Sequence, residues 1–501
     1  MYPPMVQPAL KAIRIGGHAP PGGAVWVFYK GALKVRGRWW WWATAAVLAL
    51  WMLLAASAPV VWSVVFRGYA PIEVFDHVAK RLSGHPKLEW VANPPLGWLA
   101  GWFGATPASV RQQWPFSVPP LDSRSDAKAA VALPTIQVVR GNQIIRVASL
   151  KEAARVAVSG DEIHLSAGDH HGETAVFRGK SVAIKGVGGL ARLHAPRSLA
   201  EGKAQLVLSN GQFRVSHLAL IGARAPDKNG AGIRFEGGTL HVEDCVFWGA
   251  DSGILTTSDT ERHASTVTVE RSEFGYLGHG DGYSHALYVG RLAELRVEAS
   301  YFHHAFVGHL LKSRARVNHI AYSRFTDEEG GRASYELSFP NGGEVTLTGL
   351  IVAQSASTEN SLLVSYGEEG DVWPVNRLTM LNNTLVNGLP YGGRLLRVSG
   401  ALQGGLVWNN LVVGAGTWAL PAQVNVGNNL HAEWDELVAP WRGDFRLANP
   451  DRHGWLRPQG VKGSEAMLLQ RQYVHPRRVL PLSAPDPAAA VVGALPPASA
   501  P

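Results

Sequence analysis

A six-residue pattern recurs along the C-terminal part of the chain and limits the folds that this part can adopt. The pattern is an apolar residue, two variable residues, a small or amide residue, one variable residue, and an apolar or aromatic residue. Copies begin at Val215, Val242, Val269, Val297, Ile320, Leu347, Met380 and Val407. Successive copies therefore start 23 to 33 residues apart. A period of this length indicates a repeat architecture, in which each unit is buried by stacking on its neighbours.

Each repeat also holds a second short apolar piece, which identifies the type of repeat. These pieces read AGIRFEGG, SGILTTS, HALYVG, GHLLKSRA, SYELSF, SLLVSY and RLLRVSG. Short strand-like pieces separated by glycine turns are typical of a parallel β-solenoid. Leucine-rich repeats need a denser leucine pattern, and helical repeats need longer helical runs. We therefore expect an all-β solenoid, with stacked coils about 4.8 Å apart.

The repeat register predicts columns of equivalent side chains inside the solenoid. Small and amide side chains share one position, at Cys245, Ser272, Ser300, Ser323, Asn383 and Asn410. Phenylalanines share another, at Phe247, Phe274, Phe302 and Phe325. Asn side chains hydrogen-bond well along such stacks. We therefore interpret both columns as core, and Cys245 as a buried side chain rather than a nucleophile.

Upstream of the repeats, residues 147–174 predict a cap for the N-terminal end of the solenoid. The segment has the pattern of a helix, a glycine turn and a strand. Ser149 can cap the helix, and Ala153, Ala154 and Val158 are expected on its inner side. Terminal repeats need such a cover to stay soluble.

The formal net charge of +8 over 501 residues comes from the first quarter of the chain. Residues 1–130 hold 13 basic and five acidic side chains, whereas the remainder holds 34 of each. A neutral C-terminal part argues against nucleic acid as a partner, because that binding requires a basic surface. One cysteine excludes an internal disulfide and a cysteine-based zinc site.

Residues 39–66 contain no charged side chain and are long enough to cross a membrane as a helix. Six basic and no acidic residues precede them, which favours a cytoplasmic N-terminus and an exported C-terminal part. The alternative is a cleaved signal peptide, since Ala56-Ser57-Ala58 resembles a cleavage site. We therefore predict five parts. They are a basic cytoplasmic tail (1–38), a transmembrane helix (39–66), a membrane-proximal segment and linker (67–134), the solenoid (135–480) and a Pro/Ala-rich tail (481–501).

The SLKEAARVAVSGDEIHLSAGDH segment and the VExSxF steps together resemble the right-handed parallel β-helix proteins of the pectin-lyase-like superfamily. HALYVG, GHLLKSRA, SFPNGG and SYGEEG are similar to a bacterial β-helix group within it. The resemblance implies a right-handed β-helix, and, with the predicted span, a single-pass protein of the bacterial inner membrane whose β-helix lies in the periplasm. The superfamily includes polysaccharide lyases, hydrolases, epimerases and non-enzymatic proteins, and the signatures of its pectate lyases, pectin hydrolases and mannuronan epimerases are absent here.

Polar side chains concentrate between residues 279 and 336, where we place the candidate catalytic residues Lys312, Arg314, His285 and Glu336. Lys312 and Arg314 lie two apart on a predicted strand, so they share one face. Elimination from a uronate needs a cation for the carboxylate, a base for the C5 proton and an acid for the leaving oxygen. We predict Lys312 as the base and Arg314 as carboxylate ligand or proton donor. The alternative is a solvated pair that bridges Glu336 or Asp327.

Neighbouring aromatic and histidine side chains predict a surface for sugar binding. The candidate substrate-binding residues are His309, Tyr288, Tyr335 and Tyr366. One or two histidines are expected to shuttle protons or donate to a sugar. Their spacing matches no zinc motif, so no metal site is assigned, and calcium at residues 327–329 or 368–369 stays an open alternative.

These features favour an exported, membrane-anchored β-helix that binds an acidic polysaccharide. If it is an enzyme, a β-eliminating lyase is the first candidate and a C5 epimerase the second, because both reactions begin with the same proton abstraction. The competing class is a non-catalytic binding or scaffold protein for exopolysaccharide assembly or export.

Overall fold

The computed structural model describes residues 118–121, 134–257, 264–280, 282–328, 330–389, 392–449, 458–461, 468–482 and 492–495. By its contacts the chain divides into two compact units, residues 1–68 and 69–501, and the first unit lies outside the described residues. The predicted span at 39–66 lies outside them too. Among the helices that are described, none is long and apolar enough to cross a membrane.

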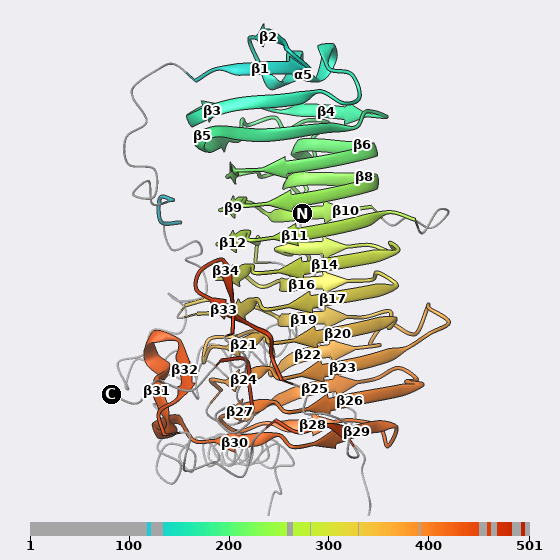
Figure 1. Cartoon of the computed structure of the whole chain (residues 1–501), viewed down its shortest axis with the longest axis vertical. Helices are drawn as coiled ribbons and strands as arrows, with labels where there is room; N and C mark the ends of the chain where they lie inside the picture. The colour runs from blue at the N-terminus through green and yellow to red at the C-terminus, as the bar shows by residue number, and fades with distance from the viewer. Residues whose placement is uncertain are drawn as a thin grey trace, which may run out of the picture. The chain divides into compact units, whose positions relative to one another are not determined.

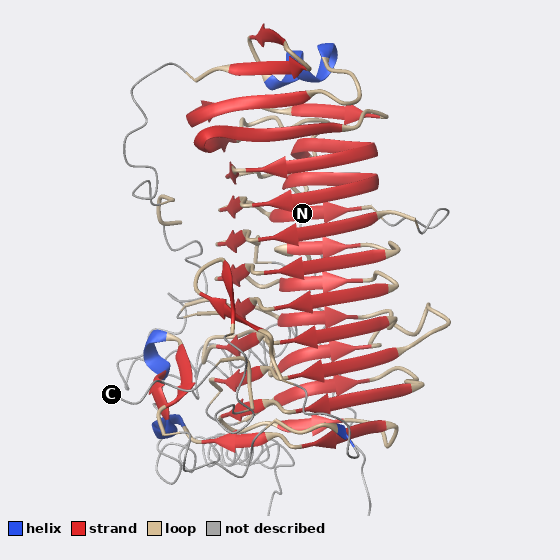
Figure 2. Cartoon of the chain, in the orientation of Figure 1, coloured by secondary structure: helices blue, strands red, loops and turns tan. Residues whose placement is uncertain are grey.

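The described part of the chain is a parallel β-solenoid, built around one 30-stranded sheet (Figures 1 and 2). Each coil adds strands that pair in parallel with the equivalent strands of the coils before and after it, and the strands form three faces. Face A contains Glu162–His171 (β3), Val182–His194 (β5), Thr266–Glu270 (β11), Glu294–Glu298 (β14), Val317–Ala321 (β17), Glu344–Thr348 (β20), Arg377–Leu381 (β23), Gly404–Trp408 (β26) and Val424–Gly427 (β29).

Face B follows face A in every coil. It contains Leu218–Ile221 (β7), Val246–Trp248 (β9), Glu273–Gly275 (β12), Tyr301–His303 (β15), Arg324–Thr326 (β18), Ile351–Gln354 (β21), Thr384–Asn387 (β24), Leu411–Val413 (β27) and Leu430–Ala432 (β30).

Face C completes each coil and holds most of the candidate site residues. It contains Ala175–Arg178 (β4), Ser252–Thr256 (β10), Leu287–Val289 (β13), His309–Ser313 (β16), Tyr335–Phe339 (β19), Leu362–Tyr366 (β22), Arg394–Val398 (β25) and Thr417–Ala419 (β28). Two long strands, Ala204–Ser216 (β6) and Ala231–Glu243 (β8), run through faces C and A, and β3 and β5 run through faces A and B.

The two predicted core columns are confirmed. The phenylalanine rings stack along the axis, with centroids 4.5 Å apart for Phe247 and Phe274, 4.4 Å for Phe274 and Phe302, and 4.5 Å for Phe302 and Phe325. In the other column each serine and asparagine side chain accepts a hydrogen bond from the backbone of the preceding coil, as Ser272 does from the N–H of Cys245 at 3.2 Å. Both columns are fully buried.

A helix covers the N-terminal end of the solenoid, as the sequence predicts. Helix Leu150–Val156 (α5) begins after Ser149, whose hydroxyl accepts from the N–H of Glu152 at 3.2 Å. Beside it, Ile136–Arg140 (β1) and Gln143–Val147 (β2) form an antiparallel hairpin that pairs with β3. The prediction for Val158 is wrong, because the helix ends at Val156 and Val158 is 47% exposed.

C-terminal segments pack on the outer side of face B. They include Trp434–Glu436 (η2), Leu437–Ala439 (β31), Pro440–Arg442 (η3), Asp444–Leu447 (β32), Arg471–Val474 (β33) and Arg478–Pro481 (β34). Residues of β31, β32 and β33 share an apolar cluster with Ile351, Val386 and Leu411 of face B. This side of the solenoid is therefore covered by later parts of the chain, whereas faces A and C are not covered by these segments.

Candidate functional site

Two neighbouring ladders on face C bring the candidate residues together. Tyr288 of β13, Lys312 of β16 and Ser338 of β19 occupy equivalent positions in successive coils. Tyr288 and Lys312 are partly exposed, whereas Ser338 is buried and bonds Ser365 of the next coil. Three residues earlier in the strand, His309 is in register with Tyr335 and contacts His285 of the preceding coil.

Lys312 and Arg314 hold the two oxygens of one carboxylate. Lys312 Nζ donates to Glu369 Oε1 at 3.0 Å, and Arg314 Nη1 lies 2.5 Å from Glu369 Oε2. Glu369 lies beyond the end of β22, and its side chain remains 43% exposed. We call Lys312 and Arg314 the carboxylate clamp. The alternative from the sequence was that Lys312 and Arg314 form a solvated ion pair with Glu336 or Asp327. The structure shows such an ion pair, but its acidic partner is Glu369.

Further contacts hold Arg314 in position. Its Nε donates to the Tyr288 hydroxyl at 3.0 Å, and its Nη1 donates to Asn341 Oδ1 at 2.8 Å. The backbone oxygen of Arg314 accepts from Trp373 Nε1 at 3.1 Å. The guanidinium is thus oriented by several coils before any ligand binds, which lowers the ordering cost of binding.

The ion pair is stable in its charged form. Burial alone would raise the pKa of Glu369, but hydrogen bonds from Arg314 and Lys312 and their charges outweigh it, so this pKa is lowered. Burial would likewise lower the pKa of Arg314, and the contacts to Glu369 and Tyr288 more than offset it.

Two buried imidazoles lie beside the clamp. His309 Nδ1 lies 3.0 Å from His285 Nδ1, and the rings meet edge to face with centroids 4.5 Å apart. Burial, followed by the charges of Lys312 and Arg314, lowers the pKa of His285 to about 3. Burial also lowers the pKa of His309 well below its ordinary value. Both imidazoles are therefore neutral at pH 7.

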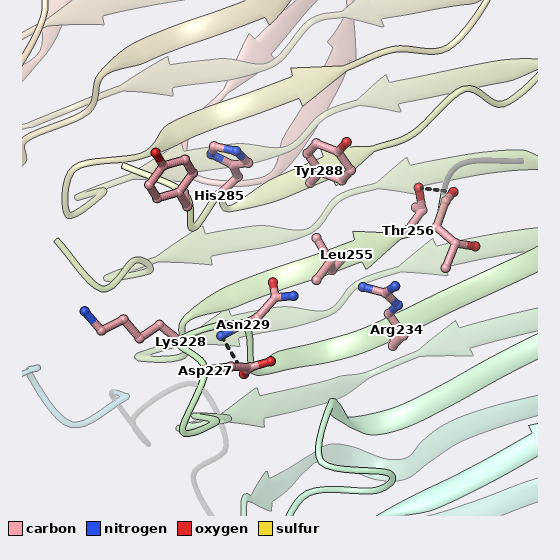
Figure 3. Close-up of a pocket in the computed structure, with 10 residues that line it drawn as sticks. Asp227, Lys228, Asn229, Arg234, Leu255, Thr256, His285 and Tyr288 are labelled. Atoms are coloured by element: carbon pink, nitrogen blue, oxygen red, sulfur yellow. Dashed lines mark hydrogen bonds between the residues drawn. The ribbon is translucent and has the colours of Figure 1, made fainter. Parts of the chain in front are cut away.

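A cavity of about 570 Å³ opens next to these residues (Figure 3). His285 and Tyr288 line it together with Arg234, Leu255 and the 227–229 loop. Leu255 pairs in register with Tyr288, and Arg234 pairs with Leu255, so the cavity follows the ladder that leads to Lys312. Its lining offers hydrogen-bond donors and acceptors around an aromatic ring, which suits a hydroxyl-rich ligand.

Glu336 and Tyr366 do not lie at this surface. Glu336 is fully buried inside the solenoid, and neither carboxyl oxygen has a hydrogen-bond partner among the described residues. Burial and the nearby Asp327 raise its pKa well above the ordinary value. Tyr366 is also in the core, where its hydroxyl donates to the backbone oxygen of Gly343 at 2.7 Å. The structure thus brings together six of the eight candidate residues and excludes Glu336 and Tyr366. The six are Lys312, Arg314, His285, His309, Tyr288 and Tyr335.

Sequence reasoning missed the roles of Glu369 and Asn341 in this arrangement. From the sequence Glu369 is a candidate calcium ligand, although an acidic residue in a turn one or two coils from a cation pair is also a candidate for an ion pair. In the described part of the chain no group of three or more His, Cys, Asp or Glu residues is arranged to hold a metal ion. Glu328 instead accepts from Arg324 and from the Tyr301 hydroxyl, each at 2.9 Å.

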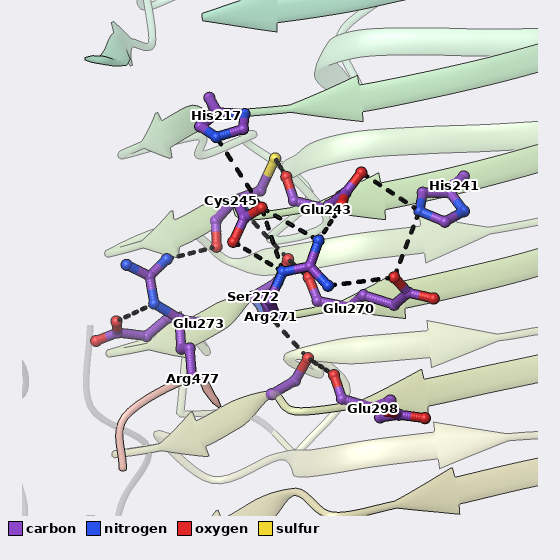
Figure 4. A network of polar contacts seen from close by, with 12 residues as sticks. His217, His241, Glu243, Cys245, Glu270, Arg271, Ser272, Glu273, Glu298 and Arg477 are labelled. Carbon is purple, nitrogen blue, oxygen red and sulfur yellow. Dashed lines mark hydrogen bonds and ion pairs between the residues drawn. The ribbon is translucent and has the colours of Figure 1, made fainter. Parts of the chain in front are cut away.

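A second polar network lies at the turn from face A to face B, around Arg271 (Figure 4). Arg271 bonds Glu243 and Asp244 and lies 3.5 Å from Glu270. Burial raises the pKa of the Cys245 thiol to about 12, so this side chain is not a thiolate at neutral pH. Arg271 thus joins carboxylates of its own and the preceding coil, which is a structural contact between coils.

The clamp, the imidazole pair and the cavity together can hold a carboxylate next to neutral proton donors and acceptors. No protein-family model matches the chain, and neither a curated protein nor a solved structure matches it.

Proposed function

We propose that face C binds an acidic polysaccharide and that the carboxylate clamp receives one of its uronate groups. The observation that carries this proposal is that Lys312 and Arg314 each bind a different oxygen of the Glu369 carboxylate. A uronate carboxylate presents the same two oxygens. Because Glu369 is 43% exposed, an incoming carboxylate can replace it without unfolding the site.

The rest of the proposed function follows from the sequence features. We infer a right-handed, pectin-lyase-like β-helix, held at the bacterial inner membrane by the apolar segment at 39–66 and exposed to the periplasm. β-Elimination is the reaction that best suits a clamped carboxylate beside neutral imidazoles, since the clamp stabilises the negative charge that develops when the C5 proton leaves. A non-catalytic binding protein is the alternative.

Binding assays with the full-length protein test this function. Polygalacturonate, alginate and hyaluronan serve as probes, and affinity is measured by microscale thermophoresis at two salt concentrations. Arg314→Gln removes charge-assisted hydrogen bonds worth about 1.5–3 kcal/mol each, so we expect at least a tenfold loss of affinity. Glu369→Gln removes the internal competitor, so we expect tighter binding.

Arg296→Gln is the matched control, because Arg296 lies on face A with its side chain 56% exposed. It removes the same charge from a different face and should leave affinity unchanged. Equal losses for Arg296→Gln and Arg314→Gln would mean that the polymers respond to overall charge and that the clamp is not the site.

A further inference from the structure

Arg234 is a cation of face C whose acidic neighbour is already bound by other residues. Its Nε lies 3.7 Å from Glu236 Oε1. Lys203 Nζ donates to that same oxygen at 3.2 Å, and Arg178 Nη1 donates to Glu236 Oε2 at 3.2 Å. In the described part of the chain the guanidinium of Arg234 makes no hydrogen bond, although its Nε is buried. Leaving a buried charged donor unpaired is costly, so an anion that binds Arg234 recovers this energy.

The guanidinium of Arg234 borders the cavity of about 570 Å³ (Figure 3). Asp227 and Lys228 line the same cavity and carry opposite charges, so Arg234 makes the lining positive overall. The 227–229 loop is held in place, because the backbone oxygen of Lys228 accepts from the Ser284 hydroxyl at 3.2 Å. The cavity is therefore formed before a ligand binds, and its charge favours an anion.

Arg234 lies on the ladder of face C that leads to the carboxylate clamp. Arg234 is in register with Leu255, and Leu255 is in register with Tyr288. Tyr288 is in register with Lys312, so three inter-strand spacings, about 14 Å, separate Arg234 from Lys312. The two side chains between these cations are uncharged, and an aliphatic and an aromatic surface suit the C–H faces of sugar rings. The ladder thus places two cations at the ends of an apolar path.

We propose that Arg234 and the cavity form a second uronate subsite, which binds another carboxylate of the chain that the clamp holds. This inference rests on the proposed function, since it needs an acidic polymer at the clamp. It adds a direction to that function, because the polymer then runs along the solenoid axis and presents two carboxylates about 14 Å apart. Glu236 makes no hydrogen bond to Arg234, so this subsite can be occupied before Glu369 leaves the clamp.

Oligomers of defined length test the second subsite with the full-length protein. The probes are trimers and hexamers of galacturonate and of mannuronate, and microscale thermophoresis measures their affinities. The outer carboxylates of a trimer are too close together to reach Arg234 and the clamp at once, whereas a hexamer is long enough. Because its second carboxylate binds at a high effective concentration, we expect the wild type to bind the hexamer at least about tenfold more tightly than the trimer.

Arg234→Gln should remove most of this length advantage, because the hexamer then has one charged subsite, as the trimer does. We expect its affinity for the hexamer to fall about tenfold. The variant loses only the 3.7 Å ion pair with Glu236, so its urea unfolding midpoint should match that of the wild type. Arg214→Gln is the matched control, because Arg214 is exposed on the face A part of β6. It removes the same charge in a neighbouring position and should keep the length advantage.

The outcomes separate the second subsite from the proposed function. A length advantage that Arg314→Gln abolishes and Arg234→Gln leaves intact overturns the subsite and keeps the clamp. Equal affinities of the wild type for trimer and hexamer, or equal losses for Arg234→Gln and Arg214→Gln, also overturn the subsite. A loss with Arg234→Gln but not with Arg314→Gln overturns the clamp, and the two-subsite path with it. Affinities that neither variant changes overturn both the proposed function and the subsite.

Discussion

Glu336 is an ionisable residue that is fully buried. Its surroundings explain why the sequence predicts it at the surface site rather than in the core. Strict alternation along β19 would put Glu336 outward, on the same side as Ser338. In the structure both Leu310 and Leu311 of β16 are fully buried, and so are Glu336 and Leu337 in the next coil. Two consecutive residues thus point inward at this corner. Because single-residue alternation cannot reveal such a corner, the sequence predicts Lys312 and Arg314 correctly as neighbours but not the place of Glu336.

We predict that Glu336→Gln stabilises the protein at neutral pH. The folded-state pKa of Glu336 is raised, so the folded chain retains a proton that the unfolded chain releases above about pH 4.3. The free energy of unfolding of the wild type therefore falls as pH rises from there towards the folded-state pKa. Each pH unit costs about 1.4 kcal/mol, a loss that the glutamine variant does not have.

Urea unfolding at pH 5 and at pH 8 measures this difference. The stability gap between Glu336→Gln and the wild type should widen at pH 8. Glu344→Gln, on the outer side of β20, is the control and should show a gap that stays small at both pH values. A gap of equal size at pH 5 and pH 8 would contradict a buried, protonated Glu336.

At the scale of strands and coils, the amide ladder shows how the repeats hold each other. Asn383 Oδ1 accepts from the N–H of Leu350 at 2.9 Å, and Asn383 Nδ2 donates to Asn410 Oδ1 at 3.0 Å. Asn410 in turn donates to Asn429 Oδ1 at 2.8 Å. The sequence predicts the contact between Asn383 and Asn410, 27 residues apart, because both occupy the same position of the repeat, whereas Asn429 is not part of the predicted column. Turn residues such as Glu369 do not occupy a repeated position of the coil. The repeat pattern therefore cannot predict their partners.

We predict that Asn383→Ala destabilises the solenoid by about 2 kcal/mol or more. The substitution leaves the buried N–H of Leu350 without its partner and removes the bonds from Asn383 Nδ2 to Asn410 Oδ1 and to the backbone oxygen of Leu347. An unsatisfied buried polar group costs about 1–3 kcal/mol. The midpoint of urea unfolding measures the loss. Asn425→Ala on β29 removes an exposed amide and should shift the midpoint little. Similar midpoints for both variants would show that the ladder contributes no stability.

At the scale of the whole solenoid, segments far apart in sequence cover face B. Ala494 N–H donates to Thr384 Oγ1 at 3.0 Å, and Gly493 N–H donates to the backbone oxygen of Asn409 at 2.9 Å. Val492 and Ala494 belong to the apolar cluster with Leu411 and Val413. Residues 492–495 therefore shield an apolar strip of the outer surface, a long-range contact that the repeat pattern does not encode.

We predict that Gly493→Ala loosens this cover. Gly493 has a φ of 104°, and an added Cβ would lie 2.8 Å from Leu411 Cβ. A backbone in this region is strained by about 1–3 kcal/mol for a residue with a side chain. Hydrogen–deuterium exchange should therefore rise in β27 and remain unchanged in β16 on face C. Gly404→Ala is the control, since nothing lies within 4 Å of its added Cβ. Faster exchange in β27 of the Gly404→Ala variant as well would point to a general effect of alanine.

The carboxylate already bound to Lys312 and Arg314 has a consequence for which ligands can enter. Glu369 is tethered to the chain, so it competes at a high effective concentration, of the order of mM for short flexible tethers. A single small acid in solution must exceed that concentration to displace it. A long chain with many charged groups gains avidity from contacts along several coils and can displace it at far lower concentration. For the acidic polymer that we propose as the ligand, an internal carboxylate of this kind sets a threshold on length, so we expect polymers to bind and their free monomers not to bind.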